Sequence, residues 1–188
     1  MLQNALHQSK SYLKEIIQPG DVVVDATAGN GHDTLFLAKL VSESGRVFAF
    51  DIQTEAIQAT QARLQQAGIT NAELVLAGHE RMAEFVPQNV RAVVFNLGYL
   101  PGADHSVTTE STKTIQAIEA ALELLLPEGR IVVVIYHGHE SGKIERAQLL
   151  EFVSGLSQDR FQVLHSAFLN QQNSPPELVV IEKKKSSS

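Results

Sequence analysis

The sequence predicts an α/β protein in which a mostly parallel, seven-stranded sheet carries helices on both faces. Two observations support this fold class. Short apolar runs alternate with longer amphipathic segments along nearly the whole chain, which is typical of a parallel sheet. The last two apolar runs leave no room for a helix between them, so they predict a C-terminal antiparallel hairpin.

Each predicted element rests on a local pattern. The strands are runs rich in β-branched and aromatic residues, at 22–26, 46–51, 72–77, 91–96, 130–136, 161–169 and 177–182. The helices carry apolar residues mainly on one face, at 1–17, 32–41, 54–67, 110–126 and 141–156, with a short helix at 80–86. Pro19, Gly68 and Pro127 are stop signals for three of these helices. We expect one domain over residues 1–183 and a disordered tail over 184–188.

Composition excludes several classes of protein. The 188 residues are 44% hydrophobic and 19% charged, which is typical of a folded globular chain. No apolar run is long enough to span a membrane, and the first residues lack the features of a signal peptide. The chain has no cysteine, which excludes disulfides, iron–sulfur clusters, thiolate zinc sites and cysteine nucleophiles. We therefore expect a cytoplasmic protein. The formal net charge of −6 is unfavourable for nucleic-acid binding, so RNA contact would need a local basic patch.

A glycine-rich turn follows the first predicted strand. It runs from Asp25 through Gly29 and Gly31, and ligands of open α/β sheets bind at this edge, outside the carboxyl ends of the strands. Asp51 ends the second strand, where a carboxylate suits the two hydroxyls of a ribose. Thr34 replaces the third glycine of the dinucleotide fingerprint. Asp25 would repel a pyrophosphate but could hold the ammonium of a methionine moiety, directly or through water, which favours S-adenosylmethionine.

The third predicted strand is followed by Gly78 and His79, at a position suited to contact an adenine. His79 could stack on the base or form a hydrogen bond with it. The plainer alternative is a surface histidine at the start of a helix. For the glycine turn, too, a plain alternative stays open: a tight strand-to-helix connection in which Asp33 supplies a charge at the helix N-terminus.

The end of the fourth predicted strand carries the acceptor chemistry. The run Asn96-Leu97-Gly98-Tyr99 is similar to the Asn-Pro-Pro-Tyr element of methyltransferases that act on exocyclic amines. An amine that attacks a methyl sulfonium must aim its lone pair at the methyl group, and the carbonyls of Asn96 and Leu97 can hold its N–H groups. Tyr99 offers a flat surface for a flipped-out base. The alternative is that Asn96 caps a strand and Tyr99 belongs to the core.

The fifth predicted strand ends in His137 and His139. Two histidines with His105 in the preceding loop allow a metal site, but no third ligand is fixed, so we expect no metal. Lys143 and Arg146 could contact phosphate, or could lie on an ordinary solvated helix face.

Five motifs, in order, resemble those of one family: DATAGNGHDT, FDIQ, NLGYLPGADHSVTT, YHGHESGK and NQQNSPPELVVIEK. They resemble the small bacterial rRNA methylases, which are similar to tRNA 5-(aminomethyl)-2-thiouridine methyltransferases. The resemblance implies a Rossmann-like class I methyltransferase fold, S-adenosyl-L-methionine as cofactor, a homodimer, and as substrate the wobble uridine of the tRNA anticodon stem-loop. It implies that the cofactor is lined by Asn30, His32, Asp33, Asp51, Gln53, Gly78 and His79. Ala103 and His105 depart from the family pattern.

The sequence thus predicts methyl transfer from S-adenosylmethionine to an aminomethyl nitrogen of tRNA, with Asn96, Tyr99 and His137 as catalytic residues. An alkylamine must lose a proton before it attacks, and His137, His139 or Asp104 could accept that proton. Four alternatives stay open. The substrate could be another RNA, such as rRNA, or a small-molecule amine or a protein. The chain could also be a dinucleotide-dependent oxidoreductase, or a non-catalytic RNA-binding module.

Overall fold

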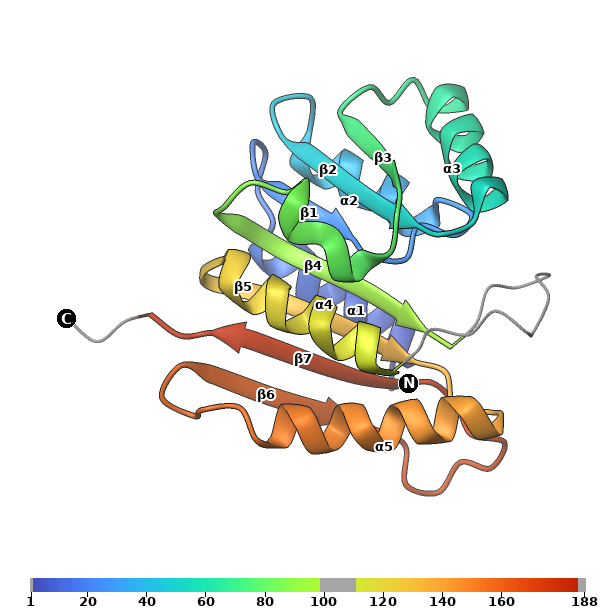
Figure 1. Ribbon diagram of the computed structural model, residues 1–188, viewed down its shortest axis with the longest axis vertical. Coiled ribbons are helices and arrows are strands. Elements are labelled where there is room, and N and C mark those ends of the chain that lie inside the picture. The colour runs from blue at the N-terminus through green and yellow to red at the C-terminus, as the bar shows by residue number, and fades with distance from the viewer. Residues whose placement is uncertain (1, 99–110, 186–188) are drawn as a thin grey trace.

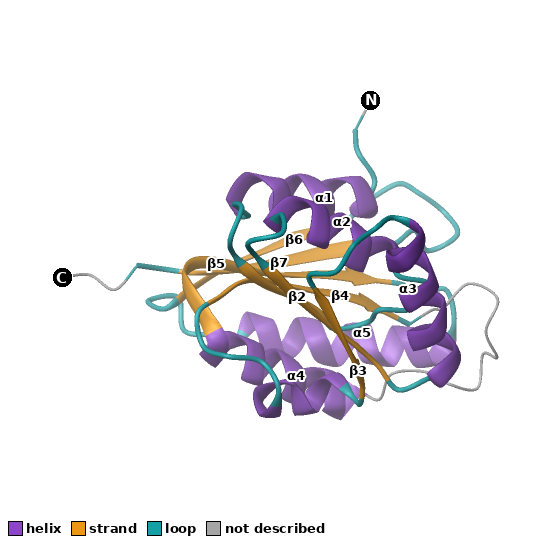
Figure 2. Ribbon diagram, turned by 90° about the horizontal axis from the view of Figure 1, so that it is seen from above, coloured by secondary structure: helices purple, strands orange, loops and turns teal. Residues whose placement is uncertain are grey.

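A seven-stranded sheet forms the centre of the molecule, with helices on both sides (Figures 1 and 2). The computed structural model describes residues 2–98 and 111–185. The strand order is β3-β2-β1-β4-β5-β7-β6. The strands are β1 (Val22–Asp25), β2 (Arg46–Asp51), β3 (Ala72–Leu76), β4 (Val90–Leu97), β5 (Leu125–Ile135), β6 (Phe161–Ser166) and β7 (Glu177–Lys183). The first five strands are parallel, whereas β7 runs antiparallel to β5 and β6, so the predicted sheet and hairpin are confirmed.

The helices divide between the two faces of the sheet. They are α1 (Ala5–Ile16), α2 (His32–Val41), α3 (Thr54–Gln66), α4 (Ser111–Leu124) and α5 (Glu140–Ser154), with a 3₁₀ helix, η1 (His79–Glu84). Figure 2 shows α1 and α2 on one face and α4 and α5 on the other. Successive residues of a strand therefore enter different cores: Val23 and Val47 pack under α1 and α2, and Val24 and Phe48 pack on the opposite face. Burial on both faces explains why the strands are apolar throughout.

Three element boundaries differ from those predicted. The fifth strand begins at Leu125 rather than at residue 130, because Leu125 pairs with Val90 before an irregularity in the register. The preceding helix therefore ends at Leu124, and Pro127 lies inside the strand instead of ending the helix. The sixth strand ends at Ser166, where its pairing with Leu178 stops.

The topology brings the carboxyl ends of β1, β2, β4 and β5 to one edge of the sheet. The turns that follow these strands meet there, so residues far apart in the sequence become neighbours. None of the helices in the described residues is long and apolar enough to cross a membrane. The tail that the sequence predicts to be disordered begins with Lys184, whose N–H donates to the carbonyl of Arg160, and residues 186–188 lie outside the described part.

Candidate functional site

Asp25 lies at the end of β1, beneath the glycine turn, and its side chain is fully buried. One carboxylate oxygen accepts the N–H of Thr27 at 3.1 Å, and the other accepts the hydroxyl of Thr34 at 2.6 Å. Burial, and then the nearby carboxylate of Asp33, raise the pKa of Asp25 to about 7. A carboxylate below the surface cannot touch a ligand directly, so the predicted direct contact with an ammonium is wrong. The contact through water stays a prediction.

The glycine turn is held against α3. Gly29 and Gly31 both have positive φ, at 52° and 76°, a region that favours glycine. The hydroxyl of Thr60 donates to the carbonyl of Gly29 at 3.0 Å, and a Cβ on Gly31 would lie only 2.8 Å from the Cα of Thr60. The turn therefore needs glycine at position 31 for two reasons, its backbone conformation and the close approach of α3.

Asp51 ends β2 beside this turn and is partly exposed. Its carboxylate accepts the N–H of Gly29 at 2.9 Å and the N–H of Gln53 at 3.0 Å. Each carboxylate oxygen keeps a further lone pair, so Asp51 can still accept hydrogen bonds from a ligand. Gln53 itself is the residue at the N-terminus of α3.

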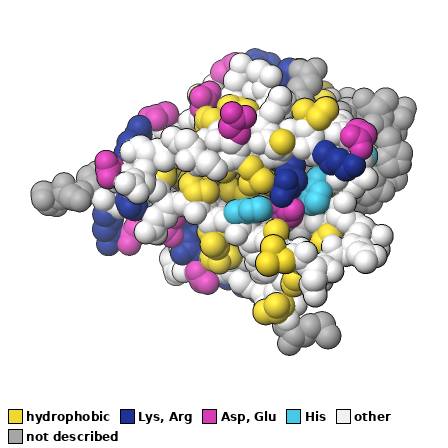
Figure 3. All heavy atoms as spheres, turned by 90° about the horizontal axis from the view of Figure 1, so that it is seen from below, with side chains coloured by type: hydrophobic (Ala, Val, Ile, Leu, Met, Phe, Trp, Pro, Cys, Tyr) yellow, Lys and Arg dark blue, Asp and Glu magenta, His cyan; other side chains and the backbone are white. Residues whose placement is uncertain are grey.

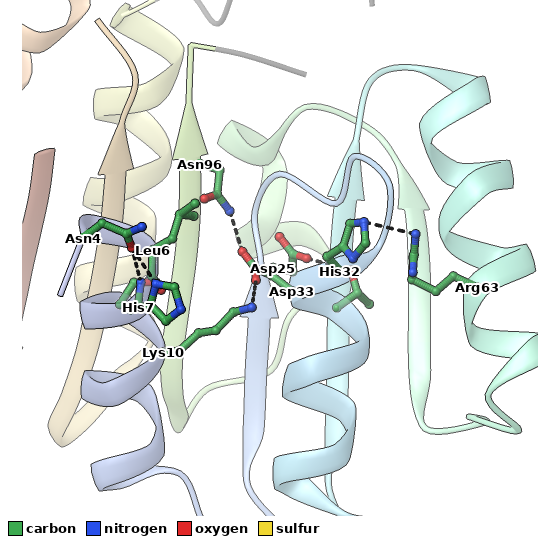
Figure 4. A network of polar contacts seen from close by, with 11 residues as sticks. Asn4, Leu6, His7, Lys10, Asp25, His32, Asp33, Arg63 and Asn96 are labelled. Atoms are coloured by element: carbon green, nitrogen blue, oxygen red, sulfur yellow. Dashed lines mark hydrogen bonds and ion pairs between the residues drawn. The ribbon is translucent and has the colours of Figure 1, made fainter. Parts of the chain in front are cut away.

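The exposed part of the turn is Asn30 and His32, and Arg63 of α3 reaches both. Its Nε donates to the carbonyl of Asn30 at 2.6 Å, and an Nη lies 3.1 Å from Nε2 of His32 (Figure 4). A guanidinium only donates, so Nε2 of His32 is the acceptor in this pair. Sequence reasoning missed Arg63 and Thr60, because the pattern of α3 alone gives no sign that it packs on the turn.

His79 is buried rather than on the surface, with 6% exposure, which excludes the surface-histidine alternative. Its Nδ1 lies 3.1 Å from the carbonyl oxygen of Ala26, and its ring packs edge-on against Phe95. The carbonyl only accepts, so Nδ1 carries a proton and Nε2 is left as an acceptor in the neutral ring. Burial lowers the pKa of His79, which keeps that ring neutral. Gly78 precedes it with an extended backbone.

Asn96 lies near the end of β4 and is tied to the turn after β1. Its backbone N–H donates to the hydroxyl of Thr27 at 2.8 Å, and its side-chain amide donates to a carboxylate oxygen of Asp33 at 2.8 Å (Figure 4). The carbonyl of Leu97, the second predicted acceptor, already accepts the N–H of Tyr136 at 3.0 Å. Tyr99, Asp104 and His105 lie outside the described residues.

His137 follows β5 and is engaged by acceptors on the far side of the site. Its Nε2 lies 3.1 Å from the carbonyl of Pro175 and 3.2 Å from the carboxylate of Glu177. Glu177, nearly buried at the start of β7, also accepts from Arg146 at 2.8 Å and from His165 at 2.7 Å. Burial alone would raise the pKa of Glu177, but hydrogen bonds from Arg146 and His165 outweigh it and lower that pKa.

This cluster corrects the view of Arg146 as a solvated residue on an open helix face, because the guanidinium pairs with a buried carboxylate. In Figure 3, which views the molecule from the side of β6 and α5, histidine side chains lie beside basic and acidic ones. Lys143 is exposed and pairs with Glu140 at 2.6 Å. Over residues 2–98 and 111–185, no group of three His, Asp or Glu side chains is arranged to hold a metal ion.

The comparisons with known proteins agree with this geometry. A family model described as "Putative rRNA methylase" matches residues 47–182. The chain belongs to this family. A relative from Arabidopsis thaliana, named tRNA (mnm(5)s(2)U34)-methyltransferase, chloroplastic, is 45% identical over 154 residues, which are 76% of this chain and 56% of the relative. The chain thus spans little more than half the length of that curated relative.

Two solved structures cover the whole rRNA methylase family member. The "putative rRNA-methylase" from Clostridium thermocellum is 48% identical, with a TM-score of 0.96, over 97% of this chain and 99% of that one. The "putative methyltransferase" from Streptococcus mutans, solved in complex with SAH, is 40% identical, with a TM-score of 0.90, over the same shares of the two chains. The predicted Rossmann-like class I methyltransferase fold is confirmed.

Proposed function

We propose that this protein is an S-adenosylmethionine-dependent methyltransferase that methylates the aminomethyl nitrogen of 5-aminomethyl-2-thiouridine at the wobble position of tRNA. The observation that carries the proposal is the juxtaposition of an amine-binding amide, Asn96, with a glycine turn between two strand-end carboxylates, Asp25 and Asp51. The name of the Arabidopsis relative supports the choice of tRNA. The SAH in the Streptococcus mutans structure supports the choice of cofactor.

The residues at the turn fit S-adenosylmethionine. Asp51 has free lone pairs for the two ribose hydroxyls, and Nε2 of His79 can accept a hydrogen bond from the amino group of adenine. The three carboxylates Asp25, Asp33 and Asp51 suit a ligand that carries a sulfonium and an ammonium. The cofactor supplies an electrophilic methyl group. Asn30, His32, Gln53 and Gly78 complete the proposed cofactor site, with Gly29 and Gly31 allowing close approach of the backbone.

The acceptor amine is held at the end of β4. The amide oxygen of Asn96 accepts one N–H of the amine, which turns the nitrogen lone pair toward the methyl group. Tyr99 is proposed to stack on the base. A protonated alkylamine has no lone pair to donate, so a proton must leave first. Because Nε2 of His137 faces two acceptors, that nitrogen keeps its hydrogen, and Nδ1 is the nitrogen that can accept a proton from the substrate.

The partner in this proposal is the anticodon stem-loop of a tRNA, and the enzyme acts as a homodimer in the cytoplasm. A dimer offsets the unfavourable net charge of −6, because two sparse basic patches can then contact one tRNA. Exposed cations on α1 and α5, such as Lys14 and Lys143, are candidates for phosphate contact.

The test uses methyl-labelled S-adenosylmethionine, the purified protein, and tRNA from cells that lack this modification. The tRNA is then digested to nucleosides and analysed by mass spectrometry. We expect label on the aminomethyl nitrogen of a 2-thiouridine, and none with the Asn96→Ala variant. Cofactor binding without any labelled nucleoside would overturn the tRNA assignment.

A second candidate is methylation of a small-molecule amine, and the acidic surface favours it. Activity on a free amine that is insensitive to salt, with no activity on tRNA, would select it. Label in rRNA instead of tRNA would select the other alternative, a ribosomal substrate.

A further inference from the structure

The contact between Asp33 and Asn96 joins two residues that are 63 positions apart in the chain. Asp33 belongs to the first turn of α2, and Asn96 to the last part of β4. Figure 4 shows the two side chains pointing toward each other across the edge of the sheet. The amide nitrogen of Asn96 lies 2.8 Å from Oδ2 of Asp33, the distance of a hydrogen bond to an ionised group.

The chemistry of the pair decides which end of the amide faces which way. An ionised carboxylate only accepts hydrogen bonds, so the end of the Asn96 amide that faces it must be the NH₂ group. The amide is planar, and its oxygen is therefore turned away from Asp33. Without Asp33, both orientations of the amide are open to Asn96, and one of them would present N–H groups to the N–H groups of an amine.

The surroundings hold this arrangement from two sides. The backbone N–H of Asn96 donates to Thr27 at 2.8 Å, which fixes the main chain from which the amide projects. The other oxygen of Asp33 lies 3.9 Å from Nζ of Lys10 on α1. Asp33 also lies at the N-terminal end of α2, where the helix dipole favours a negative charge.

We propose that Asp33 is a positioning residue for methyl transfer, which orients the amide of Asn96 so that its oxygen, and not its nitrogen, meets the acceptor amine. This inference rests on the proposed function, because it assigns a role toward the same amine. It goes beyond cofactor binding, the role that the sequence predicts for Asp33. The carbonyl of Leu97 is already bonded to Tyr136, so the amide oxygen of Asn96 is the main acceptor that remains on this strand end.

An exchange of the two side chains tests the proposal. Asn96→Asp alone places two carboxylates in contact, and we expect turnover with saturating cofactor to fall about tenfold or more. Asp33→Asn combined with Asn96→Asp restores a hydrogen bond from an amide to a carboxylate and again presents an oxygen to the amine. The double variant should recover to within about threefold of the wild type. A double variant that is no more active than Asn96→Asp would overturn the proposal.

Two lysine variants provide a matched pair. Lys10 and Lys14 both lie over the ring of Phe36, but of the two it is Lys10 that pairs with Asp33. Lys10→Met should lower turnover about twofold to threefold, and Lys14→Met should leave it unchanged with a short amine substrate. Equal losses in both would contradict a role through Asp33.

A spectroscopic measurement separates this inference from the proposed function. In the free protein, the side-chain NH₂ resonances of Asn96, assigned by their loss in Asn96→Ala, should shift and exchange faster with solvent in Asp33→Ala. Unchanged resonances would overturn the orienting role even if tRNA is the substrate. If the wild type labels no tRNA, the proposed substrate fails, and the resonances still decide whether Asp33 orients Asn96.

Discussion

The two halves of the candidate site are built in different ways. Around the glycine turn, the carboxylates of Asp25 and Asp51 accept mainly backbone N–H groups from residues close by in the sequence or in the adjoining turn. On the acceptor side, side chains contact side chains from distant segments, as Asn96 does with Asp33 and Glu177 with Arg146. The cofactor half is therefore a property of one turn and two strand ends, whereas the acceptor half exists only in the folded sheet.

This difference predicts different consequences of mutation. Changes in the glycine turn should affect stability and cofactor binding together, because the backbone itself forms the site. Changes on the acceptor side should separate turnover from cofactor affinity, because single side chains carry the chemistry.

Asn96→Ala should give the largest effect on activity. We expect turnover to fall about 100-fold or more, because the acceptor for the amine N–H is lost, while the affinity for the cofactor changes little. Steady-state kinetics and calorimetry with S-adenosylhomocysteine measure the two quantities. Equal losses in both would show that Asn96 belongs to the cofactor half.

Gly31→Ala should be the most damaging change to stability. A side chain there meets α3 and also forces a residue other than glycine to positive φ, so we expect a loss of about 3 kcal/mol in the free energy of unfolding and weaker cofactor binding. Gly68→Ala is the control, because Gly68 has a similar φ of 68° but open space around it. Urea denaturation should show a loss of only about 1 kcal/mol there. Similar losses in both would leave the close approach of α3 without effect.

Asp25→Asn tests the buried carboxylate through pH. The pKa of Asp25 is raised from 3.8 to about 7, so the folded protein binds the proton more tightly than the unfolded chain does. The wild type should therefore lose about 2 kcal/mol of stability from pH 5 to pH 7 relative to this variant, which has no charge to bury. The measurement is urea denaturation at several pH values. Asp159→Asn, at an exposed position, is the control and should keep the wild-type profile.

Glu177→Gln tests the acceptor side in the same way, with the opposite sign. The pKa of Glu177 is lowered, so its ionised form stabilises the folded state above about pH 4.5, and this contribution is lost as the pH falls further. We expect the variant to be less stable than the wild type by about 1–2 kcal/mol at pH 7, with the difference shrinking below pH 4. Thermal unfolding across this range measures it. A difference that grows toward low pH would contradict the pairing with Arg146.

Lys143→Met should have the smallest effect. Lys143 pairs with Glu140 on the exposed surface of α5, and such pairs contribute about 0.5 kcal/mol or less. If Lys143 contacts RNA phosphate, KM for tRNA should rise and its salt dependence should weaken, with turnover unchanged. An unchanged KM would leave Lys143 as an ordinary surface residue.

Much of this protein was predictable from its sequence. The order of strands and helices, the C-terminal hairpin and the position of the glycine turn all follow from local patterns of apolar residues, glycine and proline. These features depend on residues near each other in the chain, so a short window contains their cause. The misplaced start of β5 is an exception of the same kind, because Pro127 is a helix stop in isolation but lies within a paired strand in the sheet.

Only the tertiary structure decided what the individual side chains do. The sequence placed Asp25 at the ligand, whereas the fold buries it beneath the turn, and it placed His79 on the surface or beside a base, whereas the fold anchors it to Ala26. Glu177 had no local signal at all, because its partners come from β5, α5 and β6. Burial and pairing of a polar side chain depend on which distant segments pack around it, and parallel strands joined by long crossovers bring together residues that no local pattern connects.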